Sequence, residues 1–231
     1  MMAEQSPPPA YSHRFVAVAV LFASCLIVSN IIAVKLVMVA GLVLTAAIIV
    51  FPISYIVGDV LTEVYGYKAA RRVIWIGFAA NLLVVLAIAL AMELPAAPFW
   101  DKGEAFAAIL GHTPRIMAAS FLAFLVGEFA NAYVLAKMKI ATKGRWLWTR
   151  TIGSTLVGQG LDTAIFLTVA FWGVMPTDVL LQAILVQWLV KSGYEALATP
   201  ATYAAVAYLK RAEAVDVYDR DTRFNPFAVS S

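Results

Sequence analysis

Long apolar stretches recur along almost the whole chain, and they constrain its fold more than any other feature. A helix that crosses the hydrocarbon core of a bilayer needs about 20 apolar residues. Of the 231 residues, 62% are hydrophobic and only 13% are charged, whereas soluble domains are about half apolar and a quarter charged. The sequence therefore predicts an all-α membrane protein with six transmembrane helices, over residues 14–37, 41–63, 71–94, 114–138, 150–174 and 180–209.

Polar segments divide the chain into three regions. We expect a cytoplasmic tail over residues 1–13, a six-helix transmembrane domain over 14–210 and a cytoplasmic C-terminal tail over 211–231. The first apolar stretch continues into Asn30 and Lys35 and another follows at once, so we interpret it as a retained helix rather than a signal peptide. Between the third and fourth stretches, "FWDKGEAFAAIL" predicts a short helix at the outer membrane interface.

Lysine and arginine set the expected orientation. Basic residues concentrate in cytoplasmic loops, within a short distance of the helix ends. The regions that would share one side with both termini hold thirteen basic residues, and the opposite side holds only Lys35, Lys102 and Arg115. We therefore expect both termini in the cytoplasm. The thirteen are Arg14, Lys68, Arg71, Arg72, Lys137, Lys139, Lys143, Arg145, Arg150, Lys210, Arg211, Arg220 and Arg223.

Composition and residue content argue against several other functions. The net charge of +3 does not indicate nucleic-acid binding, because the basic residues other than Lys191 lie in loops or near the ends of the predicted spans. Cys25 is the only cysteine, which excludes an intrachain disulfide. The two histidines, His13 and His112, lie outside the predicted spans, so neither a Ser–His dyad nor a histidine metal site is expected there. We expect no catalytic residues, no metal and no cofactor.

Ionisable and amide side chains inside the predicted spans are the strongest functional signal. Depth in the membrane can be counted from the basic residues at the cytoplasmic helix ends, at about 1.5 Å per helical residue. By this count, acids from four helices lie at a common level near the middle of the bilayer. Glu63 is expected to lie nearer the cytoplasmic face of the membrane. The candidate substrate-binding residues are Asp59, Glu63, Glu128, Asn131, Gln159, Asp162, Lys191 and Glu195.

Such groups should face an internal polar cavity, because a charge at the bilayer centre costs at least about 2.5–3.5 kcal/mol. The alternative is that they pair with one another, with Lys191 neutralising Asp162 or Glu195. The predicted spans hold one central lysine and four central acids, so this lysine can neutralise only one of the carboxylates and negative charge remains. This surplus favours a ligand rich in hydrogen-bond donors, a cation or a transported proton.

Several motifs in order give the chain a resemblance to a known family. They are "PISYIVGDVLTEVYGYKAARR", "GEFANAYVLAKMK", "GRWLWTRTIGSTLVGQGLDT", "KSGYEALATPATY" and "LKRAEAVDVYD". With them the chain resembles the queuosine precursor transporter family, also grouped with vitamin uptake transporters, from about Phe15 to Phe227. One departure is Gln159, where the family stretch carries an acid, so this pocket has one negative charge fewer.

The resemblance implies a multi-pass transporter of the bacterial inner membrane. Its implied substrates are 7-cyano-7-deazaguanine and 7-aminomethyl-7-deazaguanine. We expect uptake by alternating access at the acidic pocket near the membrane midplane. The implied shape is similar to the substrate-binding subunits of energy-coupling-factor importers, but without an ATPase module. The expected partners are the 7-deazapurine and the lipid bilayer, with no nucleic acid; a homodimer is left open.

Three alternatives remain at this point. A substrate-binding subunit of an ATP-driven vitamin importer is the closest, and copurifying ATPase subunits would favour it. An intramembrane enzyme is a more distant alternative, because the sequence has no extended metal- or phosphate-binding motif. A channel is the third, and saturable uptake would argue against it.

Overall fold

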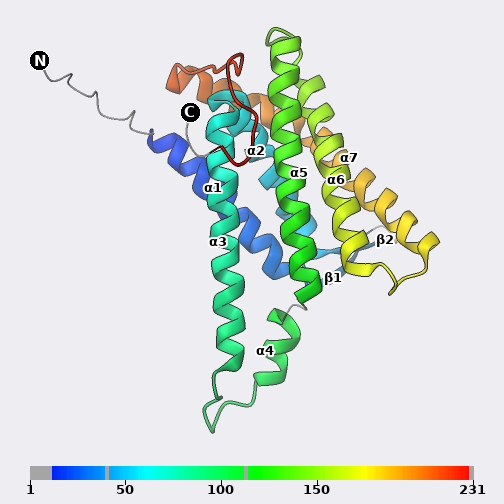
Figure 1. Ribbon diagram of the computed structural model, residues 1–231. Helices are drawn as coiled ribbons and strands as arrows, with labels where there is room; N and C mark the ends of the chain where they lie inside the picture. Colours follow the sequence, from blue (N-terminus) through cyan, green and yellow to red (C-terminus); the bar gives the residue numbers. More distant parts are fainter. Residues whose placement is uncertain (1–11, 40–41, 112–113, 229–231) are drawn as a thin grey trace, which may run out of the picture.

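The computed structural model describes residues 12–39, 42–111 and 114–228, which are mainly helical (Figure 1). Ser12 caps the first helix, its hydroxyl accepting a hydrogen bond from the backbone amide of Phe15. The elements are α1 (His13–Ile32), β1 (Leu36–Val39), β2 (Leu42–Thr45), the 3₁₀ turn η1 (Ala46–Ile49), α2 (Phe51–Tyr65), α3 (Tyr67–Glu93), α4 (Gly103–Leu110), α5 (Pro114–Ala141), α6 (Leu147–Phe171) and α7 (Thr177–Glu213).

The predicted helix over residues 41–63 is wrong in its first half. Strands β1 and β2 form an antiparallel hairpin with Leu36 opposite Thr45, and α1 ends at Ile32 rather than at residue 37. This segment is rich in valine, and a short apolar run of β-branched residues can form a strand as readily as a helix. Pro52 lies in the first turn of α2, where its missing N–H is harmless.

A single residue, Gly66, joins α2 to α3. Its φ of 82° belongs to a region that side chains disfavour, and a Cβ there would lie 2.6 Å from Val217 Cγ1. The tight connection folds α3 back along α2. It also places the end of α2 against the C-terminal segment, where the amide of Val217 donates to the carbonyl of Val64 over 3.2 Å.

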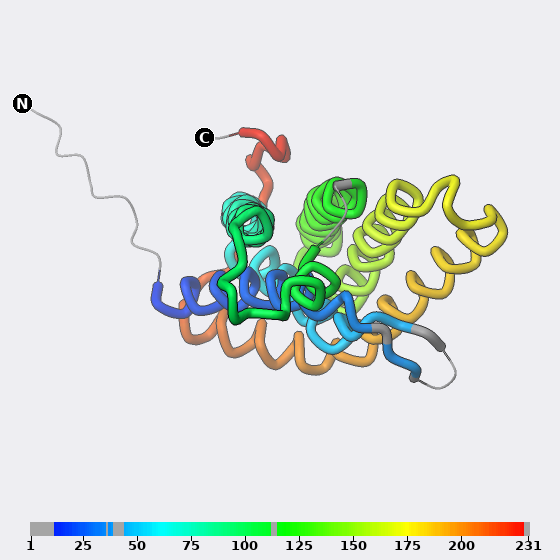
Figure 2. Tube along the Cα trace, turned by 90° about the horizontal axis from the view of Figure 1, so that it is seen from below, coloured from blue at the N-terminus to red at the C-terminus, as the bar shows by residue number. Residues whose placement is uncertain are grey.

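Helix α2 occupies the centre of the fold. It contacts α1, α3, α5 and α7, and most of its residues are buried. Helices α5 and α6 pack antiparallel along their lengths (Figure 1). Viewed from below, α3 and α5 stand nearly end-on while α1 and α7 run across the molecule (Figure 2). Polar groups on α2 are thereby surrounded by helices.

The basic segments gather at one end of the molecule. The end of α2, the loop after α5, the end of α7 and the C-terminal segment lie together there, with α4 at the other end (Figure 1). Arg14 and Glu213 form an ion pair of 3.5 Å. The C-terminal segment docks on α3, because Arg71 and Trp75 donate to the carbonyls of Asn225 and Pro226. The grouping of these segments agrees with the predicted topology, whereas the side of the membrane stays a prediction.

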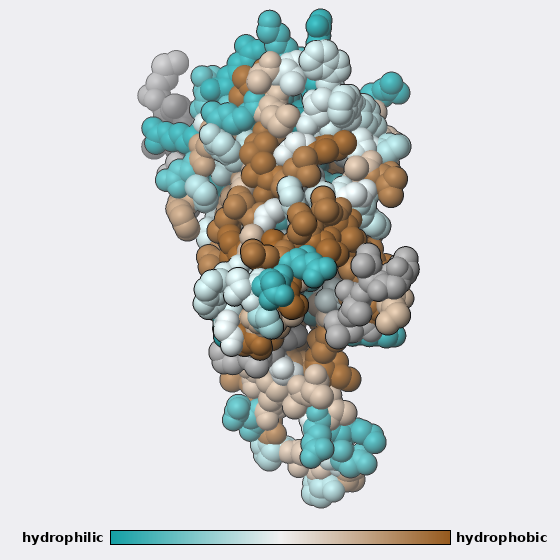
Figure 3. Space-filling view, turned by 90° about the vertical axis from the view of Figure 1, so that its right-hand side faces the viewer, coloured by the Kyte–Doolittle hydropathy of each residue, from teal (hydrophilic) through white to brown (hydrophobic). Residues whose placement is uncertain are grey.

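Four stretches among the described residues are long and apolar enough to cross a membrane: α1, α3, Gly103–Ala141, which contains α5, and α6. Helix α2, with 15 residues, spans only about 22 Å. The six-span prediction is therefore not confirmed. The short helix expected in the third loop is present as α4. Figure 3 shows a broad hydrophobic zone between hydrophilic ends, as expected for a multi-pass membrane protein.

Candidate functional site: a buried acidic cluster

Eight polar residues from four helices converge inside the helix bundle. Seven of the eight residues predicted to bind substrate are among them, and the eighth prediction, Glu63, lies one helical turn away. Tyr55 joins them as an addition from the structure. We call this set the acidic cluster; it comprises Tyr55, Asp59, Glu128, Asn131, Gln159, Asp162, Lys191 and Glu195.

The α2 side of the cluster meets α5. Asn131 donates a hydrogen bond of 2.7 Å to Asp59 Oδ1, and both side chains are buried. A Cβ on Gly58 would lie 3.2 Å from Glu128 Oε2, so the absent side chain leaves room for this carboxylate against α2. The period of the helix thus brings Tyr55 and Asp59, four residues apart, to the face that α5 covers.

The other side of the cluster joins α6 to α7. Thr155 donates to Glu195 Oε1 over 2.5 Å, and Lys191 forms an ion pair of 2.8 Å with Asp162. The Lys191 ammonium also lies 4.5 Å from the centre of the Phe51 ring. Of the two partners predicted for Lys191, the structure therefore selects Asp162. Positions 155, 159 and 162 share one face of α6, so Gln159 lies between these two contacts.

Glycines bring α5 and α6 unusually close beside the cluster. A Cβ on Gly127 would lie 2.8 Å from both the Tyr55 hydroxyl and Asp162 Cβ. A Cβ on Gly158 would lie 2.7 Å from Asn131 Cβ. Both glycines are therefore packing positions, since small residues let membrane helices approach closely.

Many polar atoms of the cluster have no hydrogen-bond partner among the described residues, although they are buried. Native proteins pair most such atoms, and each exception needs an explanation. Acceptors outnumber donors in this set. The atoms are the hydroxyl of Tyr55, Asp59 Oδ2, Glu128 Oε1, Asn131 Oδ1, Glu195 Oε2 and both amide atoms of Gln159.

Negative charge dominates the cluster. The carboxyl groups of Asp59, Glu128 and Glu195 interact with one another, and the single cation, Lys191, is bound to Asp162. Asp59 and Glu195 are the acids of the cluster that repel each other most directly, across the contact of α2 with α7. Among the described residues, no group of histidine, cysteine or acidic side chains is arranged to hold a metal ion. The arrangement suits a donor-rich organic ligand, a cation or a proton.

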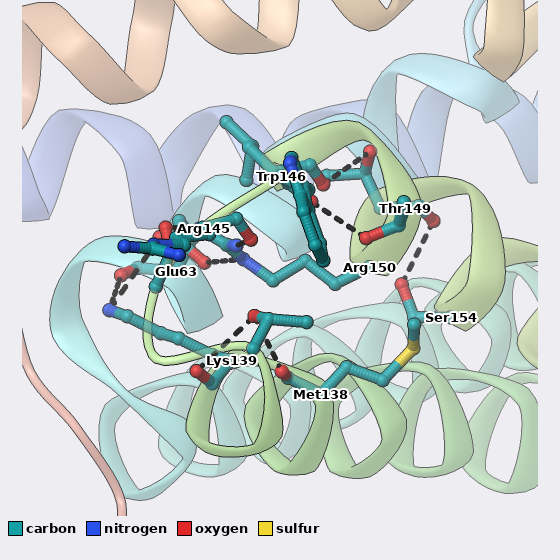
Figure 4. A network of polar contacts seen from close by, with 12 residues as sticks. Glu63, Met138, Lys139, Arg145, Trp146, Thr149, Arg150 and Ser154 are labelled. Atoms are coloured by element: carbon teal, nitrogen blue, oxygen red, sulfur yellow. Dashed lines mark hydrogen bonds and ion pairs between the residues drawn. The ribbon is translucent and has the colours of Figure 1, made fainter.

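Glu63 belongs to a separate ion network at the basic end. Arg150 Nε and Nη2 each donate to its carboxylate over 2.8 Å (Figure 4). Lys210 donates to the same carboxylate over 2.6 Å. Lys139 donates to the Glu63 carbonyl over 2.5 Å and pairs with Asp216 at 2.6 Å. Because three basic groups surround its carboxylate, we leave Glu63 out of the proposed site.

The ion network could not be found from the sequence, which marks its basic residues only as topology signals. Asp216 ties the C-terminal segment into it through Lys139 and Lys210, at 2.6 and 2.8 Å. Burial alone would raise the pKa of the Asp216 carboxyl, but hydrogen bonds from these two ammonium groups outweigh burial and hold that pKa below its usual range.

Asn30 and Asn81, two other polar residues of the predicted spans, lie apart from the cluster. Asn30 donates to Asn81 over 3.0 Å between α1 and α3. They line a small cavity of about 40 Å³ whose remaining walls are mainly aliphatic. Their mutual hydrogen bond explains why two amide side chains are tolerated between these helices. The acidic cluster therefore remains the candidate site.

Comparisons with known proteins agree with the resemblance. The chain is 33% identical to the "Probable queuosine precursor transporter" of Bacillus subtilis (strain 168) over 77% of this chain and 78% of that protein. It is 29% identical to the "Queuosine precursor transporter" of Escherichia coli (strain K12) over 53% of this chain and 52% of that protein. No solved structure matches, so the expected likeness to energy-coupling-factor subunits stays a prediction. Residues 45–205 match a family model described as a putative vitamin uptake transporter, and the chain belongs to this family.

Proposed function

We propose that this protein imports queuosine precursors, 7-deazapurine bases, through the acidic cluster. The observation that carries the proposal is the cluster itself, a buried set of unpartnered acceptors at the junction of α2, α5, α6 and α7. Pairing these atoms with a ligand would recover the free energy that burying them unpaired costs, about 1–3 kcal/mol for each group. The names of the two relatives supply the class of ligand.

The chemistry of such a base fits the cluster. A 7-deazaguanine presents a ring N–H and an exocyclic amine side by side, and one carboxylate can accept both in a planar, charge-assisted pair. Glu128 is the best candidate for this role, because its carboxylate forms no hydrogen bond or ion pair with the described residues. Asp59 is already held through one oxygen by Asn131. The acids left over would favour an aminomethyl substituent, which carries positive charge.

Transport is proposed to proceed by alternating access, without ATP hydrolysis. The sequence contains no Walker-type nucleotide loop. In this mechanism the buried cluster is an occluded site, and the ion network around Glu63 closes the cytoplasmic end. The neighbouring carboxyl groups of Asp59 and Glu195 are the first candidates for coupling to a proton gradient.

Uptake of labelled 7-cyano-7-deazaguanine into cells unable to make it tests the function, with 7-aminomethyl-7-deazaguanine as a second substrate. We expect saturable uptake that depends on this protein. At least two of the variants Asp59→Asn, Glu128→Gln, Asp162→Asn and Glu195→Gln should abolish uptake while reaching the membrane. Normal transport by all four would exclude the acidic cluster as the site.

Purified protein in liposomes tests the mechanism. Labelled base should equilibrate across the bilayer without ATP, and accumulation driven by an inward proton gradient would establish coupling. Movement only after an ATPase module is added would contradict the proposal and favour a substrate-binding subunit of an ATP-driven importer.

A further inference from the structure

Gln159 is the most completely buried amide in the acidic cluster, and its burial has no structural explanation. Its side chain is 0% exposed, and neither its amide nitrogen nor its amide oxygen has a hydrogen-bond partner among the described residues. Its neighbours on the same face of α6, Thr155 and Asp162, are both engaged by α7. The unpaired amide nitrogen and oxygen of Gln159 therefore lie between the Thr155–Glu195 and Asp162–Lys191 contacts.

Packing alone does not account for this residue. An apolar side chain of similar volume would fill the same space without burying an unpaired donor and acceptor, and would be expected to stabilise the bundle. Gly158 already provides the close approach of α5 at this level. A buried, unpartnered polar group retained in a packed core indicates a partner that is present only during function.

We propose that Gln159 contacts the substrate directly, with its amide N–H on an acceptor and its amide oxygen on an adjacent donor of the base. This inference rests on the proposed function. A carboxamide offers a donor and an acceptor in one plane, and in the cluster only that of Gln159 has both atoms unpartnered, because the Asn131 amide already donates to Asp59. In a 7-deazaguanine the ring N3 and N9–H form such a pair, on the edge that adjoins the donor edge assigned to Glu128.

The proposed contact with the base also explains why the side chain at position 159 is uncharged. A glutamate at this position would place a second acceptor against ring N3 and would add a negative charge to a cluster that already has a surplus. Gln159→Glu should therefore lower uptake of the neutral cyano base and shift the preference toward the cationic aminomethyl base. Gln159→Leu should reduce uptake of both bases.

The experiment compares Gln159→Leu and Gln159→Glu with wild type, with Gln182→Leu on the exposed face of α7 as the matched control. Labelled 7-cyano-7-deazaguanine is the probe, and an analogue with C–H in place of ring N3 is the competitor. Loss of two hydrogen bonds should lower uptake by Gln159→Leu at least about tenfold, with the thermal midpoint of the ligand-free protein equal to or above that of wild type. The analogue should compete about tenfold more weakly than the parent base in wild type, and equally well in Gln159→Leu.

The outcomes separate this inference from the proposed function. If wild type transports the base and Gln159→Leu does so equally well, the direct contact is wrong while the function stands. A lower thermal midpoint for Gln159→Leu would assign the amide a structural role and overturn the inference. Equal competition by the analogue in wild type would reject the contact with N3. If wild type transports neither base, the proposed function fails and the inference fails with it.

Discussion

Glu63 and Arg150 form a buried two-bond ion pair, with both nitrogen–oxygen distances at 2.8 Å. The two residues come from α2 and α6, and both side chains are almost completely buried. One turn earlier on α2, Asp59 lies in the acidic cluster. Two carboxylates four residues apart on one short helix therefore have different environments: one is neutralised by fixed cations and the other faces acids and unpaired polar groups.

Removing the guanidinium should destabilise the protein strongly. Arg150→Ala leaves the Glu63 carboxylate buried with fewer cations, and breaking a buried pair from one side costs about 3–5 kcal/mol. We expect a clear fall in the thermal midpoint in detergent and in the amount of protein in the membrane. Arg145→Ala, an exposed position in the adjacent loop, is the control and should melt like wild type. Equal midpoints for the two variants would contradict a structural role for the pair.

Charge removal at two carboxylates should separate stability from transport. Glu128→Gln removes a group without a partner among the described residues, so stability should be unchanged while uptake falls by about 10–100-fold through loss of charge-assisted bonds. Glu63→Gln weakens three contacts and should lower the thermal midpoint. Uptake assays and melting curves on both variants check this, and the reverse pattern would exchange the two roles.

Alanine at two glycines of α6 should have opposite effects. A Cβ on Gly158 meets Asn131 Cβ at 2.7 Å and the Gly127 carbonyl at 3.0 Å, so Gly158→Ala should push α5 away and abolish uptake. A Cβ on Gly153 meets only the flexible end of Met138, at 3.0 Å. Gly153→Ala should be neutral, or stabilising by up to about 1 kcal/mol through helix propensity. Uptake and thermal midpoints are the measurements, and equal tolerance of both substitutions would refute close packing at Gly158.

Docking of the C-terminal segment should depend on pH through Asp216. Its pKa in the folded protein is lowered, so its contribution is complete above the unfolded value of about 3.9 and is lost as pH falls through the folded pKa. Hydrogen exchange in residues 215–228, corrected for intrinsic rates, should stay slow from about pH 7 to 5 and rise below about pH 4. Asp216→Asn should exchange faster already near neutral pH, whereas exposed Asp221→Asn should not. Identical exchange in all three proteins would rule out this anchor.

Membrane orientation can be tested by cysteine labelling in a Cys25→Ser background. A cysteine at Asp101 should react with an impermeant reagent in intact cells, because the basic residues predict that this loop is outside. Cysteines at Arg145 and Arg220, both exposed, should react only after permeabilisation. Labelling of the last two in intact cells would invert the topology.

Amino-acid sequence determined the class of protein and most of the polar residues that meet in its interior. Apolar stretches long enough to cross a bilayer predicted α3, α5 and α6 closely, because helix length and composition are local properties. The spacing of Asp59 and Glu63, four residues apart, placed them on one face of α2 for the same reason. The period of a helix fixes which residues share a face, whatever the helix packs against.

Tertiary structure decided which partner each polar residue meets. The different environments of Glu63 and Glu128 depend on Arg150 and Lys210, which are 87 and 147 residues from Glu63 in the chain. The hairpin of β1 and β2 was also beyond the sequence pattern, because a short apolar, valine-rich run is compatible with either a strand or a helix. Local periodicity gives the direction of a side chain, but only the packing of distant helices determines whether a buried carboxylate finds a cation or remains available for a substrate.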